Sequence, residues 1–71
     1  MTLTQLNAFV LVARLGSVRA AAAALGVSES AVSQAITALR QDLGDPLISR
    51  SQAGMTLTPG GTRLLGTASQ I

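Results

Sequence analysis

The stretch that most constrains this chain covers residues 25–44, LGVSESAVSQAITALRQDLG, and it predicts one helix over residues 29–43. Ser28 stands before this helix as a preferred N-cap, and Gly44 stands after it as a preferred stop. An apolar stripe at helical spacing is expected to face the core: Val32, Ala35, Ile36, Leu39 and Leu43. The opposite face carries uncharged hydrogen-bonding side chains: Ser30, Ser33, Gln34, Thr37 and Gln41. Such a face suits either plain solvent or a partner that presents hydrogen-bonding groups.

Two shorter helices are predicted before this one. The first covers about residues 4–15 and ends at Gly16, and the second covers residues 18–25 and ends at Gly26. Their candidate caps are Thr2 or Thr4 and Ser17. The positions expected in the core are Leu3, Leu6, Phe9, Val10 and Ala13 in the first helix and Val18, Ala21, Ala22 and Leu25 in the second.

The apolar period changes after the third helix. Residues 47–50 and 55–57 are predicted to be two short strands of a hairpin, joined by a loop over residues 51–54. Thr58 followed by Pro59 is typical of a helix start. This fourth helix carries one apolar side, which the chain leaves unfinished at its last residue, so the helix is expected to continue in a longer parent protein: Leu64, Leu65, Ala68 and Ile71.

The composition limits the chemistry that the chain can perform. Its 71 residues make one small domain, and the absence of Cys and His excludes disulfides and Cys/His metal sites. Without His, Cys, Lys or Tyr, no usual pair of nucleophile and base can be assembled, so the chain is not expected to be an enzyme or to hold a cofactor or metal. Its longest apolar runs fall well short of the ~18 residues that a membrane span needs. Five Arg against three acids permit an anionic partner without requiring one.

Taken together, the order of elements predicts a mainly α winged helix-turn-helix fold. Ala22 allows the second and third helices to cross closely, Gly26 takes the turn between them, and Val32 anchors the third helix. In such a fold the third helix lies in the DNA major groove, where base edges present donors and acceptors. Gln34 can then pair with adenine, and Thr37 can meet a thymine methyl or a phosphate.

The charged side chains each have two interpretations. Glu29 can complement the helix dipole or accept a hydrogen bond from cytosine. Arg19, in the first turn of its helix, gains nothing from the dipole and is assigned to a phosphate rather than to solvent. Arg50, at the end of a predicted strand, is the best candidate for a phosphate or the minor groove. Arg40 is expected to meet water or the nearby Asp42.

The whole chain resembles the N-terminal DNA-binding domain of a LysR-type transcriptional regulator. The matching residues are LTQLNAFVLVARLGSVRAAAAALGVSESAVSQAITALRQDLGDPLISR and then LTPGG. The resemblance implies a bacterial, cytoplasmic regulator that binds double-stranded operator DNA as a dimer or tetramer. It also implies a division into a DNA-binding domain, residues 1–58, and the beginning of a linker and dimerisation helix, residues 59–71. A small-molecule effector would bind a C-terminal domain that this chain lacks.

The resemblance, together with the helical face, yields three sets of candidate residues. Base-reading candidates on helix 29–43 are Glu29, Ser30, Ser33, Gln34 and Thr37. Backbone and wing candidates, the wing being residues 47–57, are Ser28, Arg19, Arg50, Ser51 and Gln52. Dimerisation candidates are Leu64, Leu65 and Ala68. An alternative function is a helical protein-interaction or dimerisation module that reads no bases.

Overall fold

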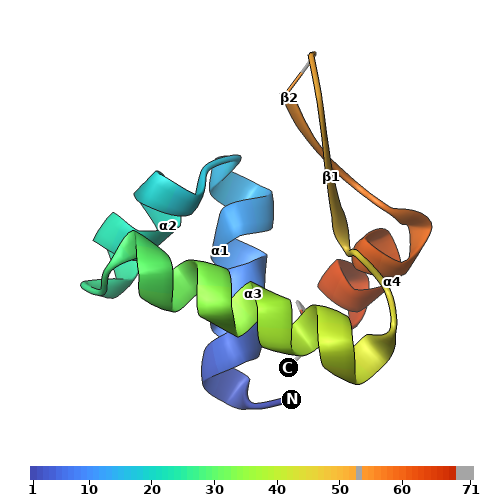
Figure 1. Ribbon diagram of the computed structural model, residues 1–71, viewed down its shortest axis with the longest axis horizontal. Coiled ribbons are helices and arrows are strands. Elements are labelled where there is room, and N and C mark those ends of the chain that lie inside the picture. The colour runs from blue at the N-terminus through green and yellow to red at the C-terminus, as the bar shows by residue number, and fades with distance from the viewer. Residues whose placement is uncertain (53, 69–71) are drawn as a thin grey trace.

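The computed structural model describes residues 1–52 and 54–68, with the side chain of Ser51 left out. Ala53, Ile71 and the rest of residues 69–71 lie outside the description, so the predicted segment 59–71 can be followed only in part. The order of elements is the predicted winged helix-turn-helix (Figure 1): α1 Leu3–Leu15, α2 Val18–Leu25, α3 Glu29–Leu43, β1 Ile48–Ser51, β2 Gly54–Leu57 and α4 Pro59–Ala68. In Figure 1 the hairpin β1–β2 projects away from the helical body.

The first three helices begin at the predicted caps. The Thr2 hydroxyl accepts from the Gln5 N–H at 3.1 Å in a reciprocal capping box. The Ser17 and Ser28 hydroxyls accept from backbone N–H groups three residues later, at 3.2 and 3.1 Å. Gly26, with a φ of 71°, reverses the chain between α2 and α3 in a conformation that residues with a Cβ rarely adopt. The helix-turn-helix geometry is therefore encoded locally.

The core lies where α1 crosses α2 and α3. Its largest fully buried side chains come from three different parts of the chain: Phe9, Val12, Val32, Leu39 and Leu47. Ala22 is 4% exposed and Val32 is 1% exposed, so both stand in the helix crossing that the sequence predicts for them. Small side chains on α2 let α3 approach, and α3 is thereby fixed with its apolar stripe inward.

The predicted apolar stripes are wrong at some helix ends. Leu3, at the start of α1, is 63% exposed, and Leu43, at the end of α3, is 43% exposed. Leu25, the last residue of α2, is 36% exposed. The burial of α1 centres instead on Ala8, Phe9 and Val12. Helical spacing identifies a face, but each helix packs only along the part that crosses a neighbour.

The first strand begins one residue later than predicted because Leu47 is not extended. Leu47 has a φ of 65°, which is unusual for a branched side chain, and its side chain is 1% exposed. Its N–H donates to Asp45 Oδ1 at 2.7 Å, and its carbonyl accepts from the Thr58 N–H at 3.0 Å. These bonds hold a turn that buries Leu47 and redirects the chain into β1.

Helix α4 starts against this turn. The Thr58 hydroxyl accepts from the Gly61 N–H at 3.0 Å and donates to Asp45 Oδ1 at 2.8 Å. A Cβ on Gly61 would lie 2.1 Å from the Leu47 carbonyl oxygen, so only glycine permits this approach. None of the helices in the described ranges is long and apolar enough to cross a membrane.

Candidate nucleic-acid interface

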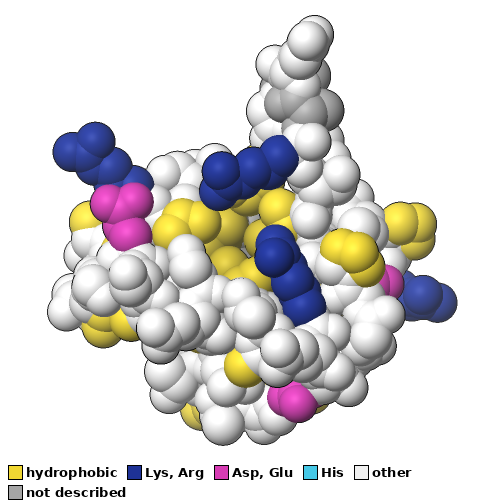
Figure 2. Space-filling view, in the orientation of Figure 1, with side chains coloured by type: hydrophobic (Ala, Val, Ile, Leu, Met, Phe, Trp, Pro, Cys, Tyr) yellow, Lys and Arg dark blue, Asp and Glu magenta, His cyan; other side chains and the backbone are white. Residues whose placement is uncertain are grey.

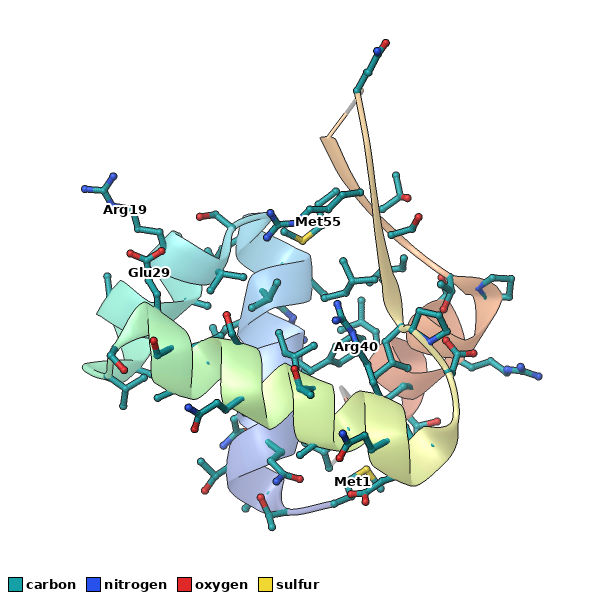
Figure 3. The ribbon with its side chains drawn as sticks, viewed as in Figure 1. Met1, Arg19, Glu29, Arg40 and Met55 are labelled. Atoms are coloured by element: carbon teal, nitrogen blue, oxygen red, sulfur yellow. The ribbon has the colours of Figure 1, made fainter. Side chains whose placement is uncertain are left out.

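The outward face of α3 is a row of short, uncharged side chains. Four of the five base-reading candidates extend along it without burial: Ser30, Ser33, Gln34 and Thr37. Gln41 continues the row toward the end of the helix and is also exposed. In Figure 2 the front of α3 is white between the magenta of Glu29 and the dark blue of Arg40, which Figure 3 labels. The structure therefore gathers these polar groups on one accessible surface.

The N-terminal end of α3 combines a cap with charge. The Ser28 hydroxyl accepts from the Ala31 N–H at 3.1 Å, and its own O–H remains able to donate outward. Glu29 occupies the first helical turn, where a carboxylate complements the dipole. Glu29 also lines an open cavity of about 380 Å³ with Arg19 and Arg50, so three charged candidates from separate segments border the same surface depression.

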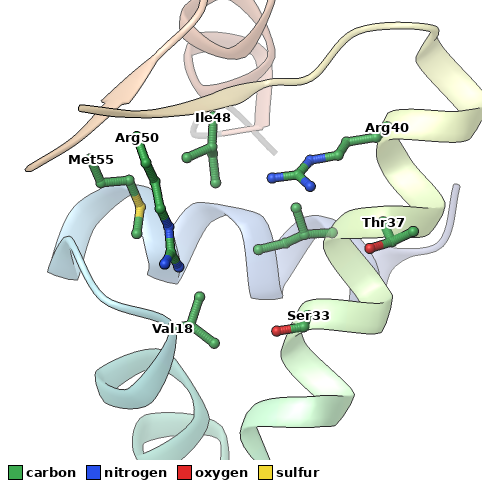
Figure 4. A pocket seen from close by; sticks show the side chains of 8 residues that line it. Val18, Ser33, Thr37, Arg40, Ile48, Arg50 and Met55 are labelled. Atoms are coloured by element: carbon green, nitrogen blue, oxygen red, sulfur yellow. The ribbon is translucent and has the colours of Figure 1, made fainter.

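The hairpin brings Arg50 back toward the helices. Arg50 lies on β1 opposite Met55 of β2 in the antiparallel register. Both side chains extend toward the body of the domain rather than toward the hairpin tip (Figure 4). Gln52, beyond the end of β1, is exposed, whereas Ser51 is described only in its backbone. The wing candidates are thus divided between the foot of the hairpin and its tip.

A groove of about 300 Å³ separates α3 from the hairpin. We call it the helix–wing groove, and Figure 4 displays its lining: Val18, Ser33, Ile36, Thr37, Arg40, Ile48, Arg50 and Met55. Its floor is apolar, and Figure 2 reveals yellow side chains between two dark blue ones at this position. Arg40 and Arg50 enter it from different walls. The groove therefore joins a cationic rim to an apolar base.

Arg40 is the residue whose position the sequence did not predict. Its Nε donates to the Pro46 carbonyl at 2.9 Å, which turns the guanidinium toward the hairpin. Asp42, the expected neighbour, instead pairs with the Met1 amino group at 2.6 Å. A signal was present, because Arg40 follows Thr37 by three residues and Ser33 by seven and so shares their face of the helix.

The dimerisation candidates on α4 are partly buried. Leu64 and Leu65 pack against the core of the same chain, and Ala68 is also partly buried. Leu64 lines a shallow cavity together with Leu43 and Thr67, so part of its surface remains open. These side chains complete the domain and leave some apolar surface beyond it.

Comparison with known proteins assigns the fold to a family. Residues 3–62 match the family described as "Bacterial regulatory helix-turn-helix protein, lysR family". An uncharacterised HTH-type transcriptional regulator of Mycobacterium tuberculosis is 55% identical over all 71 residues of the chain, which span 22% of that relative. The regulator PtxR of Pseudomonas aeruginosa is 44% identical over the same length, which is 23% of it.

Solved structures agree with this assignment. The DNA-binding domain of CbnR in a DNA complex superposes with a TM-score of 0.90 at 38% identity, covering 99% of this chain and 80% of that one. The DNA-binding domain of BenM, bound to catB site 1 DNA, gives a TM-score of 0.91 at 30% identity, covering 99% and 79%. The M. tuberculosis relative and PtxR are named as HTH-type transcriptional regulators, and CbnR is named as a LysR family transcriptional regulator. The chain belongs to the LysR family of bacterial regulatory helix-turn-helix proteins.

Proposed function

We propose that the chain binds double-stranded DNA with sequence specificity and thereby regulates transcription. The observation that carries this proposal is the exposed row of short, uncharged polar side chains along α3, on a fold whose relatives include two domains solved in complex with DNA. A helix fits the major groove, about 12 Å wide, and short polar side chains match the donors and acceptors there. α3 would lie in that groove, and the hairpin would contact the flanking backbone or the minor groove.

The base-reading residues would be those nearest the N-terminal end of α3. Helices of this type contact base edges mainly with their first turns. Gln34 offers both a donor and an acceptor and so suits adenine, while Ser30 and Ser33 can bond to bases or phosphates. Thr37 presents a methyl and a hydroxyl one turn further on. Glu29 either accepts from a cytosine amino group or complements the helix dipole.

Backbone contacts would flank this surface. Arg19 and Arg50 suit phosphate oxygens because a guanidinium offers several donors in one plane. Ser28 can donate its hydroxyl proton, and Ser51 and Gln52 would contribute from the hairpin. Such contacts position the helix and make affinity depend on salt, without reading sequence themselves.

The remaining proposals concern the longer protein. Leu64, Leu65 and Ala68 would pair α4 with a second copy, so that two α3 helices read a roughly palindromic site. The chain spans 22% of the similar M. tuberculosis relative, and a small-molecule effector would bind outside these 71 residues. The protein would act in the bacterial cytoplasm, where its DNA is found.

Selection from a pool of random duplexes tests the central proposal and requires no known operator sequence. Repeated capture by the purified chain is expected to enrich one motif, with its fixed bases spaced for one or two α3 helices. Enrichment of no motif would contradict base reading. It would favour the alternative of a protein-interaction module.

A further inference from the structure

We propose that the helix–wing groove is a phosphate clasp, in which Arg40 and Arg50 hold one DNA backbone phosphate from two sides. The inference rests on the proposed function and extends it to a site and to a residue, Arg40, that the sequence assigned to water or Asp42. It depends on the lining of the groove and on the hydrogen bond that orients Arg40.

The charges of the groove favour an anion. Two guanidinium groups line it, and no carboxylate does so within residues 1–52 and 54–68. The nearest acids line the adjoining cavities: Glu29 lies beyond Arg50 at one end, and Asp45 lies beyond Arg40 at the other. In the described part of the chain neither Arg40 nor Arg50 forms an ion pair with a carboxylate. The groove lining therefore carries a net positive charge.

Arg40 is held ready for a ligand. Its Nε–H is engaged by the Pro46 carbonyl at 2.9 Å, which leaves four N–H donors on the two terminal nitrogens. Figure 4 places these terminal nitrogens over the groove, facing the hairpin. A guanidinium that is already oriented loses less conformational freedom when it binds a phosphate. The backbone turn that ends α3 thus serves to aim this side chain.

Two hydroxyl groups add hydrogen-bond donors next to Arg40 along α3. Ser33 and Thr37 line the groove on successive turns below Arg40, and each can donate to a phosphate oxygen. Val18 and Met55 are only partly buried and leave apolar surface in the groove, which suits the carbon atoms of deoxyribose. The groove therefore offers both parts of a sugar–phosphate unit a complementary surface.

The geometry of duplex DNA places a phosphate strand at this position. The major and minor grooves are separated by one sugar–phosphate strand, so a protein that reads the major groove with α3 and contacts the adjacent minor groove with its hairpin must straddle that strand. The space between the two elements is the helix–wing groove. The clasp therefore assigns phosphate binding to the helix–wing groove as a whole rather than to α3 or the hairpin alone.

Fluorescence anisotropy with a random-sequence duplex, titrated with salt, tests the clasp independently of base reading. Arg40→Ala and Arg50→Ala are each expected to weaken binding by about tenfold and to reduce the salt slope by about one. Arg14→Ala, near the end of α1, removes the same charge outside the groove lining and is the matched control. Circular dichroism confirms that each variant is folded.

A double-mutant cycle distinguishes one shared phosphate from two separate contacts. The Arg40→Ala/Arg50→Ala variant is expected to lose less affinity than the product of the two single losses, because the second substitution acts on a clasp that is already open. Losses that multiply would overturn the shared site. Arg40→Lys keeps the charge without the Nε donor and should fall between wild type and Arg40→Ala.

Four further outcomes separate this inference from the proposed function. If Arg40→Ala binds as well as Arg14→Ala while the wild type binds DNA, the clasp is wrong and the proposed function stands. If Arg40→Ala weakens only a selected duplex and not a random one, Arg40 reads a base, which also overturns the clasp. If the variants show the coupled losses but the wild type enriches no motif, the clasp stands and base reading is contradicted. A wild type that binds no duplex overturns both.

Discussion

The Thr58 hydroxyl donates to the Asp45 carboxylate at 2.8 Å and thereby ties the start of α4 to the turn that follows α3. The same carboxylate oxygen accepts from the Leu47 N–H at 2.7 Å, immediately before β1. The end of α3, the hairpin and the start of α4 therefore meet at one side chain. A disturbance at Asp45 is expected to reach the orientation of the wing as well as the packing of α4.

Asp45 should make stability sensitive to acid. The backbone N–H of Leu47, the Thr58 hydroxyl and the positive charge of Arg63 lower the pKa of Asp45 below its ordinary value of 3.8, against an opposing effect of partial burial. Because the folded-state pKa is the lower one, the stabilisation is present above the unfolded-state value and is lost as the pH falls through the folded-state value. Asp45→Asn should therefore show a smaller fall in Tm than wild type as the pH is lowered below 3.8.

Thermal unfolding, followed by circular dichroism at pH values above and below 3.8, measures the difference in Tm between wild type and Asp45→Asn. Glu29→Gln makes the same charge change outside the junction and serves as the comparison. Wild-type and Asp45→Asn curves that fall in parallel below pH 3.8 would contradict the role of the junction.

Gly61→Ala should destabilise the domain. The new Cβ would lie 2.1 Å from the Leu47 carbonyl oxygen, which is fixed backbone, so α4 or the turn must move. We expect a loss of about 1–3 kcal/mol in the free energy of unfolding. Gly66→Ala is the matched control in the same helix, since a Cβ there meets nothing within 4 Å, and it should stabilise by about 0.5–1 kcal/mol. Urea denaturation of both variants measures this contrast, and equal effects would refute it.

The helix boundaries could be predicted from sequence because their causes are local. Ser17, Ser28, Gly26 and Gly44 each act within one turn of their own position, through a side-chain cap or a left-handed backbone. The left-handed conformation of Leu47 could not be predicted in this way. It depends on Asp45, Thr58 and the approach of α4, which only the folded chain brings together.

The candidate site likewise has one part that could be predicted from local sequence and one part that depends on the tertiary structure. The polar face of α3 follows from helical period alone, so Ser33 and Thr37 could be selected from sequence. Predicting the helix–wing groove requires the position of the hairpin relative to α3, and the spacing of residues in the sequence does not give that position. The sequence therefore assigns Arg40 to water or to Asp42. In the structure Arg40 lies on the same face of α3 as Thr37, and Arg50 lies on the opposite wall of the groove.

Leu65→Asp should weaken self-association. Leu65 packs partly against the core of its own domain, so folding must be measured separately from association. Removing a buried leucine contact is worth about 1.5–3 kcal/mol, which corresponds to more than a tenfold weaker dimer. Sedimentation equilibrium gives the monomer–dimer constant, and Thr67→Asp adds the same charge at an exposed position of α4 as the control. A constant that Leu65→Asp leaves unchanged would remove Leu65 from the interface.

Gln34→Ala should reduce the discrimination between a selected and a scrambled duplex more than it reduces the affinity for DNA in general. A bidentate contact to adenine is worth about 1–3 kcal/mol against the wrong base, so the ratio of selected to scrambled binding should fall accordingly. Gln41→Ala removes the same side chain two turns further along α3 and should leave this ratio unchanged. Equal losses on both duplexes for Gln34→Ala would assign that residue to the backbone.

Comparing the affinity of the wild-type chain for a selected duplex with that for a scrambled duplex of equal length, over a range of salt concentrations, tests most directly whether α3 reads bases. We expect the two plots of log affinity against log salt to fall with similar slopes, because phosphate contacts are shared, and to remain separated by a constant preference for the selected duplex. Coincident plots with the same slope would mean that the chain supplies electrostatic attraction alone and would contradict base reading by α3.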